Sequence, residues 1–354
     1  MSYKVTIVAE PEALFKLSMN KGFTEGRNLR KIFSNLSEIF LIMDEREFEA
    51  QWMDSESPIR KVVDAYNLPR PKAKSGLKKI YTNPGLCYEK APFAIWLLNN
   101  TEENLRKFKD YLGVWAVDTS ELTDDFFYLN HSRGYDKDDE ITGSRGNGWG
   151  NFLEQIPNPL PPINSIVLND RHLIFNTNES RAARTGFWGF NNLKILLNEI
   201  LPRSLKVPFH IFIYCQHPRL DITTTDSIVS RFIQDVKNLR EYEIIVELVY
   251  AVARHKRGLY SNYFLLDADR GFNVFKDANC TVLCGENDLT IKSYLCDPYS
   301  SGDTSYDSAR SKIQKICNAC REVYLNPTTD TENPEKNARV QTDCDDFFYN
   351  RLFS

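Results

Sequence analysis

The strongest constraint on the fold lies in the second half of the chain, where short apolar runs alternate with longer stretches of helical periodicity. Residues 164–170, 209–215 and 242–253 are apolar runs of the length of buried strands. Residues 190–201 and 224–240 repeat apolar side chains every three or four positions, which is typical of amphipathic helices. Strands that alternate with helices build a sheet covered by helices. We therefore predict an α/β fold, with a mixed sheet flanked by helices in this half.

Other segments complete the predicted larger domain. Residues 172–176 and 259–268 have the composition of strands, and residues 307–324 repeat apolar side chains like a C-terminal helix. The polar stretch that follows this helix favours a mobile loop. We expect residues 160–300 to form one central sheet with helices on both faces.

The first half of the chain predicts a smaller α/β domain. Residues 3–9 alternate like a strand, and residues 28–66 carry the spacing of amphipathic helices. Residues 94–100 favour a helix and residues 111–118 a strand.

Glycines and prolines mark the boundary between the two predicted domains. Residues 131–150 are polar and glycine-rich, which favours a surface loop, and residues 155–164 carry four prolines, which suit an extended connector. We therefore divide the chain into residues 1–150, of unknown role, and residues 151–354.

The composition limits the class of protein. A chain of 354 residues with 42% hydrophobic and 26% charged residues is long enough for two folded domains. Its net charge of -4 argues against a protein that coats nucleic acid, although a local basic patch can still bind phosphate. The sequence has no apolar run of membrane-spanning length and starts without the pattern of a secretion signal. With eight cysteines read as reduced thiols, we expect a cytoplasmic protein without membrane contact.

The segment between residues 250 and 275 carries the most informative motif. His255, Arg257 and Asn262 stand at the spacing His-x-Lys-x4-Asp, and Gly271 follows further on. This spacing resembles the phospholipase D superfamily. The resemblance implies a histidine that attacks phosphorus, a cation that neutralises the phosphate and a carboxylate that orients a histidine. It covers roughly residues 160–300.

Two departures from the family pattern bear on catalysis. Arg257 replaces lysine and keeps the charge, whereas Asn262 replaces aspartate and loses it. A neutral amide does not stabilise an imidazolium, and in serine proteases the same change costs about four orders of magnitude in rate. We therefore expect weak or no catalysis.

Active members of this family combine two copies of the motif. His131, Arg133 and Asp138 also satisfy the spacing, but they fall in the predicted glycine-rich loop. A homodimer that brings two His255 residues together is the alternative source of a second copy.

Basic residues around the motif are candidates for phosphate contacts. Arg254 and Lys256 flank His255, and Arg171 lies in a second polar segment beside His172. A solvated strand end guarded by charge explains the same residues without a ligand. Arg181, Arg184, Phe187 and Trp188 offer further cations and a stacking surface, with an ordinary loop as the alternative.

The cysteines do not predict a metal site. Cys280 and Cys284, and Cys317 and Cys320, have nearly the pair spacing of zinc ligands, but they occur in strand and helix patterns rather than in turns. The pair Asp267 and Asp269 is explained by a polar turn. We expect neither a metal nor a cofactor, and we expect the four cysteines to lie apart.

Three functions remain open from the sequence. The first is a weakly active or inactive module that binds nucleic acid or another phosphodiester, and the resemblance suggests a setting in bacterial defence or mobile elements. The second is a phosphodiesterase or nuclease with His255 as nucleophile. The third is a protein-interaction subunit without a ligand at His255.

Overall fold

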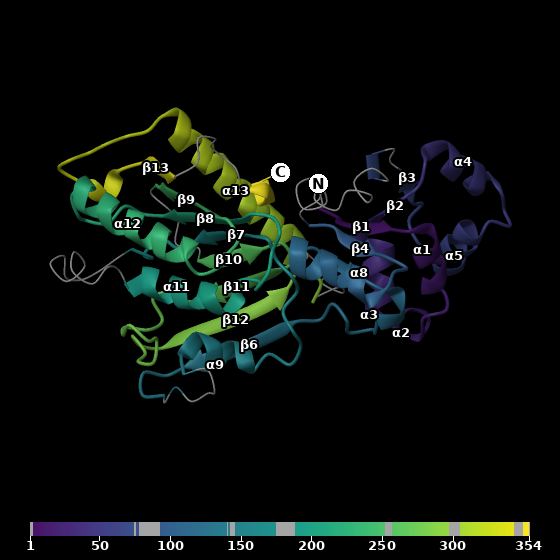
Figure 1. Ribbon diagram of the computed structural model, residues 1–354, viewed down its shortest axis with the longest axis horizontal. Coiled ribbons are helices and arrows are strands. Elements are labelled where there is room, and N and C mark those ends of the chain that lie inside the picture. The colour runs from purple at the N-terminus through teal and green to yellow at the C-terminus, as the bar shows by residue number, and fades with distance from the viewer. Residues whose placement is uncertain are drawn as a thin grey trace.

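The computed structural model describes residues 3–73, 76–77, 93–139, 141, 146–174, 188–251, 257–296, 305–342 and 350–353. In these residues the chain forms two sheets with helices around them, and each sheet occupies its own half of the molecule (Figure 1). The predicted α/β class is confirmed, and so is the larger mixed sheet flanked by helices.

The smaller sheet consists of five parallel strands in the order β3-β2-β1-β4-β5. In chain order the strands are β1 (Val5–Ala9), β2 (Ser37–Leu41), β3 (Lys72–Ala73), β4 (Ile95–Leu97) and β5 (Trp115–Val117). The helices of this half include α1 (Pro11–Leu17), α2 (Lys21–Thr24), α3 (Asn28–Lys31), α4 (Glu45–Met53), α5 (Pro58–Tyr66) and α8 (Glu102–Arg106).

The prediction of a helix at residues 94–100 is wrong, because β4 occupies this segment. All three residues of β4 are buried, so the strand is covered on both faces. A strand buried on both faces has no alternation of polar and apolar residues, and a short apolar run then does not distinguish strand from helix.

The larger sheet has eight strands in the order β13-β9-β8-β7-β10-β11-β12-β6. Strands β7, β8 and β9 are parallel, and the other neighbouring pairs are antiparallel. In chain order the strands are β6 (Asn130–Tyr135), β7 (Ser165–Asn169), β8 (Phe209–Cys215), β9 (Ile244–Tyr250), β10 (Gly258–Ser261), β11 (Phe264–Ala268), β12 (Asn287–Ser293) and β13 (Arg339–Thr342).

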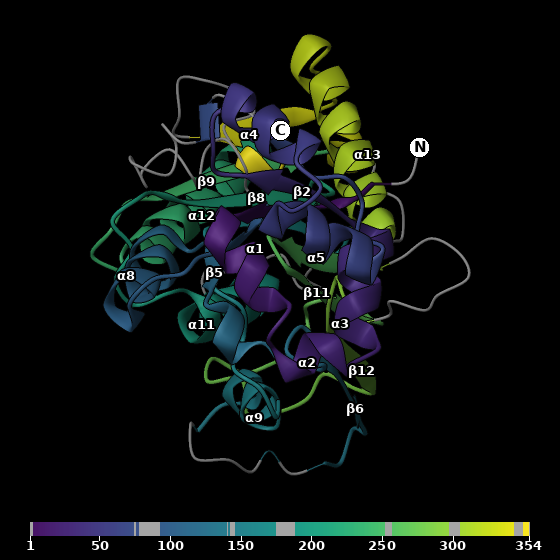
Figure 2. The same ribbon diagram turned by 90° about the vertical axis from the view of Figure 1, so that its right-hand side faces the viewer.

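Helices cover both faces of the larger sheet, as predicted. On β7, Ile166 and Leu168 pack into one core with the helices α9 (Gly148–Glu154), α11 (Trp188–Ile200) and α12 (Ile222–Lys237). Val167, between them, points to the opposite face and joins the core that includes α13 (Ser305–Leu325). Figure 2 shows α13 on the other side of the sheet from α11 and α12.

The same core also joins the two sheets. Val167 and Phe212 of the larger sheet share it with Ile7 and Ile95 of the smaller one. A continuous apolar core of this kind holds the halves together as one packed body.

Four further local predictions differ from the structure. Residues 37–41, within the segment predicted as amphipathic helices, form the strand β2. Residues 131–135, predicted as a loop, belong to the edge strand β6, whose pairing with β12 compensates for its lack of apolar alternation. Residues 172–174, predicted as a strand, form a turn. Residues 259–268, predicted as one strand, are β10 and β11 joined by a tight turn at Asn262 and Tyr263. Because the residues on both sides of this turn are apolar, the sequence pattern does not indicate the turn.

The helices of the described residues do not include one that is both long and apolar enough to cross a membrane. The predicted division near residue 150 stays a prediction, although β6, which precedes it, and α9, which spans it, pack with the larger sheet.

Candidate functional site

The carboxyl ends of β7, β8 and β9 meet at one edge of the larger sheet because these strands are parallel. The antiparallel strands β10 and β13 begin at the same edge, with Gly258 opposite Asn169 and Arg339 opposite Tyr250. The chain crosses from β9 over to β10 on the far side of β7. In open α/β sheets, ligands bind at such an edge, next to the strand where the order reverses.

Several strand ends bring an arginine to this edge. Arg171 follows β7, Arg219 follows β8, Arg257 precedes β10 and Arg339 begins β13. We call the group formed by Asp170, Arg171, His217, Arg257 and Arg339 the carboxyl-edge site.

Asp170 is the buried carboxylate of this site. Its side chain accepts hydrogen bonds from the backbone nitrogens of His172 (3.0 Å) and Phe272 (2.7 Å). Burial raises the pKa of the Asp170 carboxyl above its ordinary value, although the two N–H donors and the Arg257 guanidinium act in the opposite direction. Gly271 lies close by with a φ of +92°, and a Cβ there would lie 2.7 Å from the Asp170 carboxylate.

Arg257 lies beside this carboxylate. Its Nε is 4.0 Å from Asp170 Oδ1, and its Nη1 donates to the carbonyl oxygen of Asp269. The Nε itself is buried and lacks a hydrogen-bond partner among the described residues. A buried donor without a partner costs free energy, and an incoming acceptor relieves that cost.

A small cavity of about 100 Å³ opens between the ends of β7 and β8. Arg171 forms one wall, with its Nε 2.6 Å from Gln216 Oε1. The remaining lining comes from His172, Ile174, Gln216, His217, Pro218, Arg219 and Glu335. Because a water molecule occupies about 30 Å³ in the liquid, the cavity has room for a few heavy atoms, such as one phosphate group.

His217 is a buried member of this lining, with 2% of its surface exposed. Its Nδ1 lies 2.8 Å from the carbonyl oxygen of Pro218 and therefore carries the proton of the neutral ring. Burial lowers the pKa of His217, which favours this neutral form. The Nε2 is buried and finds no partner in the described part of the chain.

Arg339 closes the site on the side of β13. It forms a paired contact with the carboxylate of Asp226 on α12 and stacks over the ring of Tyr250 at 5.2 Å. Tyr250 in turn lies 4.8 Å from the ring of His217. Asp226 therefore compensates the charge of Arg339, as Glu335 does for Arg219 at 3.9 Å.

The structure separates two residues of the predicted motif. Arg257 precedes β10 at the carboxyl edge, whereas Asn262 lies in the turn at the other end of this strand. The Asn262 Oδ1 accepts from the backbone nitrogens of Asn164 and Ser165, at 3.0 and 3.2 Å. Its Nδ2 donates to Asn164 Oδ1 at 3.0 Å. The side chain of Asn262 thus holds a buried turn and does not reach the carboxyl edge.

The other predicted site residues have different positions. His255, Arg254 and Lys256 lie outside the described residues, as do Arg181, Arg184 and Phe187. Residues Ala251 and Arg257, on either side of the basic run, both lie at the carboxyl edge. Trp188 begins α11.

The second motif copy lies on a strand, not in the predicted loop. His131 and Arg133 belong to β6, while Asp138 follows it. The His131 ring packs 5.4 Å from Phe152, and Arg133 Nη1 donates to Asn151 Oδ1. Strands β11 and β12 lie between β10, which Arg257 precedes, and the edge strand β6, which carries His131 and Arg133.

The cysteines with nearly the pair spacing of zinc ligands lie in separate places. Cys280 packs in the core that contains α9, whereas Cys317 and Cys320 lie on α13. Groups of three or more His, Cys, Asp or Glu side chains that could hold a metal do not occur in the described part of the chain. At the carboxyl edge of the smaller sheet, Asp44 and Asp118 instead cap the helical turns that follow them.

Asp170, His217 and Arg339 were not singled out from the sequence. The first two carry a recognisable signal, since Asp170 directly follows a buried strand and His217 lies two residues after the end of another. Arg339 has no such signal because its position depends on the long-range pairing of β13 with β9.

Comparison with known proteins adds no assignment. Neither a scan against models of protein families nor a search among curated proteins finds a match for this chain. The class is therefore defined by the fold and the site, as an α/β protein with an arginine-rich strand-end site.

Proposed function

We propose that the carboxyl-edge site binds a phosphodiester, with nucleic acid as the ligand class, and that the protein has weak or no catalytic activity. The observation that carries the proposal is the buried Nε of Arg257. It lies 4.0 Å from the Asp170 carboxylate, lacks a hydrogen-bond partner among the described residues, and is at the edge where ligands bind in such sheets. A guanidinium offers several N–H donors in one plane, which suits phosphate oxygens. As part of this proposal, we retain the resemblance of the segment around Arg257 to the phospholipase D superfamily.

The balance of charges around Arg257 supports an anionic ligand. Asp170 is the carboxylate nearest to the Arg257 Nε, and its burial works against its negative charge. The charge of Arg257, whose side chain is 21% exposed, is therefore only partly compensated. The cavity beside Arg171 gives a phosphate group a place of suitable size.

The position of Asn262 supports binding over catalysis. In the family pattern this position carries an aspartate that assists the histidine. Here the side chain is committed to buried hydrogen bonds with Asn164 and Ser165.

Binding and turnover assays on the purified protein distinguish the candidates. We expect salt-dependent binding of a fluorescein-labelled single-stranded DNA and no cleavage of it. Cleavage by the wild type that is lost in His255→Ala would replace the proposal with a phosphodiesterase. Absence of binding at low salt would leave a protein-interaction subunit.

A further inference from the structure

The small cavity between the ends of β7 and β8 has a size that limits which phosphates fit into it. Its volume of about 100 Å³ is roughly that of three water molecules. One phosphate group fits this space, but there is no room for the sugars on both sides of an internal phosphodiester. A phosphate at the end of a nucleic-acid strand carries a sugar on one side only, so its free side can enter the cavity.

His217 is the lining residue whose chemistry distinguishes one kind of phosphate from another. Its Nδ1 donates to the Pro218 carbonyl oxygen at 2.8 Å, so the neutral ring has its lone pair on Nε2. This Nε2 is buried and lacks a hydrogen-bond partner among the described residues. Because Nδ1 is engaged, Nε2 is the ring nitrogen left for a molecule in the cavity that His217 lines. The cavity therefore offers an acceptor to a ligand that brings a proton.

Phosphate monoesters and diesters differ in this proton. A monoester has a second pKa of about 6, and its monoanion carries a P–OH group that donates a hydrogen bond. A diester has no such group, so it can approach Nε2 only if His217 takes up a proton. Burial lowers the pKa of His217, and Arg339 acts in the same direction. The Pro218 carbonyl and the Asp226 carboxylate act against this lowering without overcoming it.

Arg171 forms a fixed wall of the cavity. Its Nε donates to Gln216 Oε1 at 2.6 Å, and the backbone nitrogen of Gln216 donates to the Arg171 carbonyl oxygen at 3.2 Å. These two contacts with one residue hold the guanidinium in place, and a guanidinium suits phosphate oxygens. Glu335 is the carboxylate of the lining, and it lies 3.9 Å from Arg219, with which it forms an ion pair.

We propose that this cavity binds the terminal phosphomonoester of a nucleic-acid strand, with His217 Nε2 accepting the P–OH hydrogen bond and Arg171 contacting the phosphate oxygens. The inference rests on the proposed function and names the part of the ligand that the site selects. Arg257 lies beside Asp170, which directly precedes Arg171. We therefore expect the strand to continue from the cavity towards Arg257.

Three fluorescein-labelled single-stranded DNAs of one sequence serve as probes. One carries a 5′-phosphate, one carries a 3′-phosphate, and one has hydroxyls at both ends, with the label on an internal base. At neutral pH we expect the wild type to bind one of the phosphorylated strands about tenfold more tightly than the hydroxyl strand, because of the added charge-assisted hydrogen bond. The preferred strand identifies the end that enters the cavity.

The substitution His217→Asn removes the acceptor. The asparagine amide can still donate to the Pro218 carbonyl oxygen in place of Nδ1, but it has no atom at the position of Nε2. We expect the preference for the phosphorylated strand to fall to less than about twofold. This preference is a ratio of two affinities within one variant, so a fraction of unfolded protein does not change it.

The substitution His131→Asn is the matched control. The Nε2 of His131 is also buried without a hydrogen-bond partner among the described residues, but this histidine lies on the edge strand β6. The control should keep the preference of the wild type.

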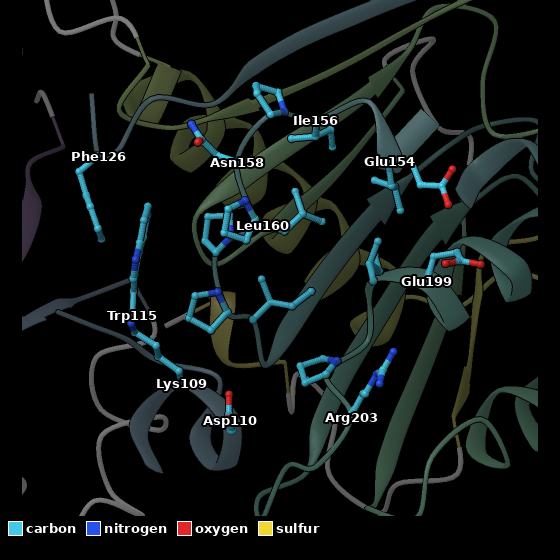
Figure 3. A pocket seen from close by; sticks show the side chains of 18 of the residues that line it. Lys109, Asp110, Trp115, Phe126, Glu154, Ile156, Asn158, Leu160, Glu199 and Arg203 are labelled. Atoms are coloured by element: carbon cyan, nitrogen blue, oxygen red, sulfur yellow. The ribbon is translucent and has the colours of Figure 1, made fainter. Parts of the chain in front are cut away.

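A pair of arginine variants tests the second contact. Arg171→Ala should weaken binding of the phosphorylated strand more than binding of the hydroxyl strand. The control is Arg203→Ala, because Arg203 is an exposed cation that lines a different, larger groove at the amino ends of β7 and β8 (Figure 3). Arg203→Ala should leave the preference between the strands unchanged.

Competition on the wild type needs no variant. Inorganic phosphate carries a P–OH group near neutral pH, whereas sulfate has the same shape and carries no proton. At equal ionic strength, we expect inorganic phosphate to displace the phosphorylated strand at a lower concentration than sulfate does.

Several outcomes would overturn the proposal: equal affinities of the wild type for the three strands, an unchanged preference in His217→Asn, or equal competition by phosphate and sulfate. If phosphorylation adds nothing while the hydroxyl strand binds in dependence on Arg257, phosphodiester binding stands and the terminal-phosphate inference is wrong. If the preference for a phosphorylated end depends on His217 while Arg257→Ala binds like the wild type, the opposite holds. If none of the strands binds, both are wrong.

Discussion

The hydroxyl of Tyr263 lies 3.0 Å from the backbone nitrogen of Trp115 and joins a turn of the larger sheet to a strand of the smaller one. The same hydroxyl donates to the carbonyl oxygen of Ala94 at 2.9 Å. The contact between the sheets is thus fixed by directional hydrogen bonds as well as by the shared apolar core.

The first prediction concerns this joint. Tyr263→Phe leaves a buried N–H of Trp115 and a buried carbonyl of Ala94 without their partner, so we expect the free energy of unfolding to fall by about 2 kcal/mol. Tyr111→Phe, at a side chain that is 41% exposed, is the control and should change it by less than about 0.5 kcal/mol. Urea denaturation measures both. Equal effects would show that the joint does not depend on the Tyr263 hydroxyl.

The second prediction concerns Asn262. In Asn262→Asp, a carboxylate oxygen replaces the Nδ2 that donates to Asn164 Oδ1, and two acceptors then face each other in a buried turn. Asn164 cannot turn its amide without losing its bond to the Leu112 carbonyl, at 2.8 Å. We expect a loss of about 1 to 3 kcal/mol in unfolding free energy and no gain in phosphodiester cleavage. A gain in cleavage would instead assign a catalytic role to this position.

The third prediction is a pH dependence of stability from Asp170. A carboxyl whose pKa is raised in the folded state binds more protons in the folded protein than in the unfolded one. Its full contribution to stability is therefore present below the pKa of the unfolded state. The contribution is lost as the pH rises through the pKa of the folded state. The substitution Asp170→Asn removes this pH-dependent contribution to stability. The stability of the wild type relative to the variant should fall as the pH rises from about 4 towards 7 in urea titrations. A stability difference between wild type and variant that rises with pH would contradict the raised pKa of Asp170.

The fourth prediction tests the close approach of Gly271 to Asp170. Gly271→Ala places a Cβ 2.7 Å from the carboxylate, at a φ of +92° that suits glycine alone. We expect a loss of about 2 kcal/mol in unfolding free energy and weaker DNA binding, because the displaced Asp170 also displaces Arg257. Gly285→Ala is the control, since its Cβ meets nothing within 4 Å. If both variants lose the same stability and DNA affinity, the close approach of Gly271 to Asp170 does not constrain the site.

The elements with strong periodicity could be predicted from the sequence. Strands β7, β8 and β9 and helices α11 and α12 lie within or close to their predicted segments, and Asp221 caps α12. Each of these elements is long and buries a distinct apolar surface, so its local pattern agrees with its place in the fold.

The rest depends on contacts between distant segments. The edge strand β6 has a polar sequence and is a strand through its backbone pairing with β12. The turn at Asn262 is set by Asn164, which lies far away in the chain. The carboxyl-edge site could be predicted only in part. Arg171 and Arg257 stand in or near polar motifs and Asp170 directly follows a buried strand, whereas Arg339 is placed by the sheet order.

The salt dependence of DNA binding by wild type and Arg257→Ala tests the central proposal most directly. Each phosphate contact adds a nearly constant amount to the slope of log affinity against log salt, so loss of Arg257 should lower the slope by about 1 and weaken binding. Arg46→Ala, an exposed cation on α4, is the control and should match the wild type. His255→Ala should weaken binding much less than Arg257→Ala. An unchanged slope and affinity in Arg257→Ala would contradict phosphodiester binding at the carboxyl-edge site.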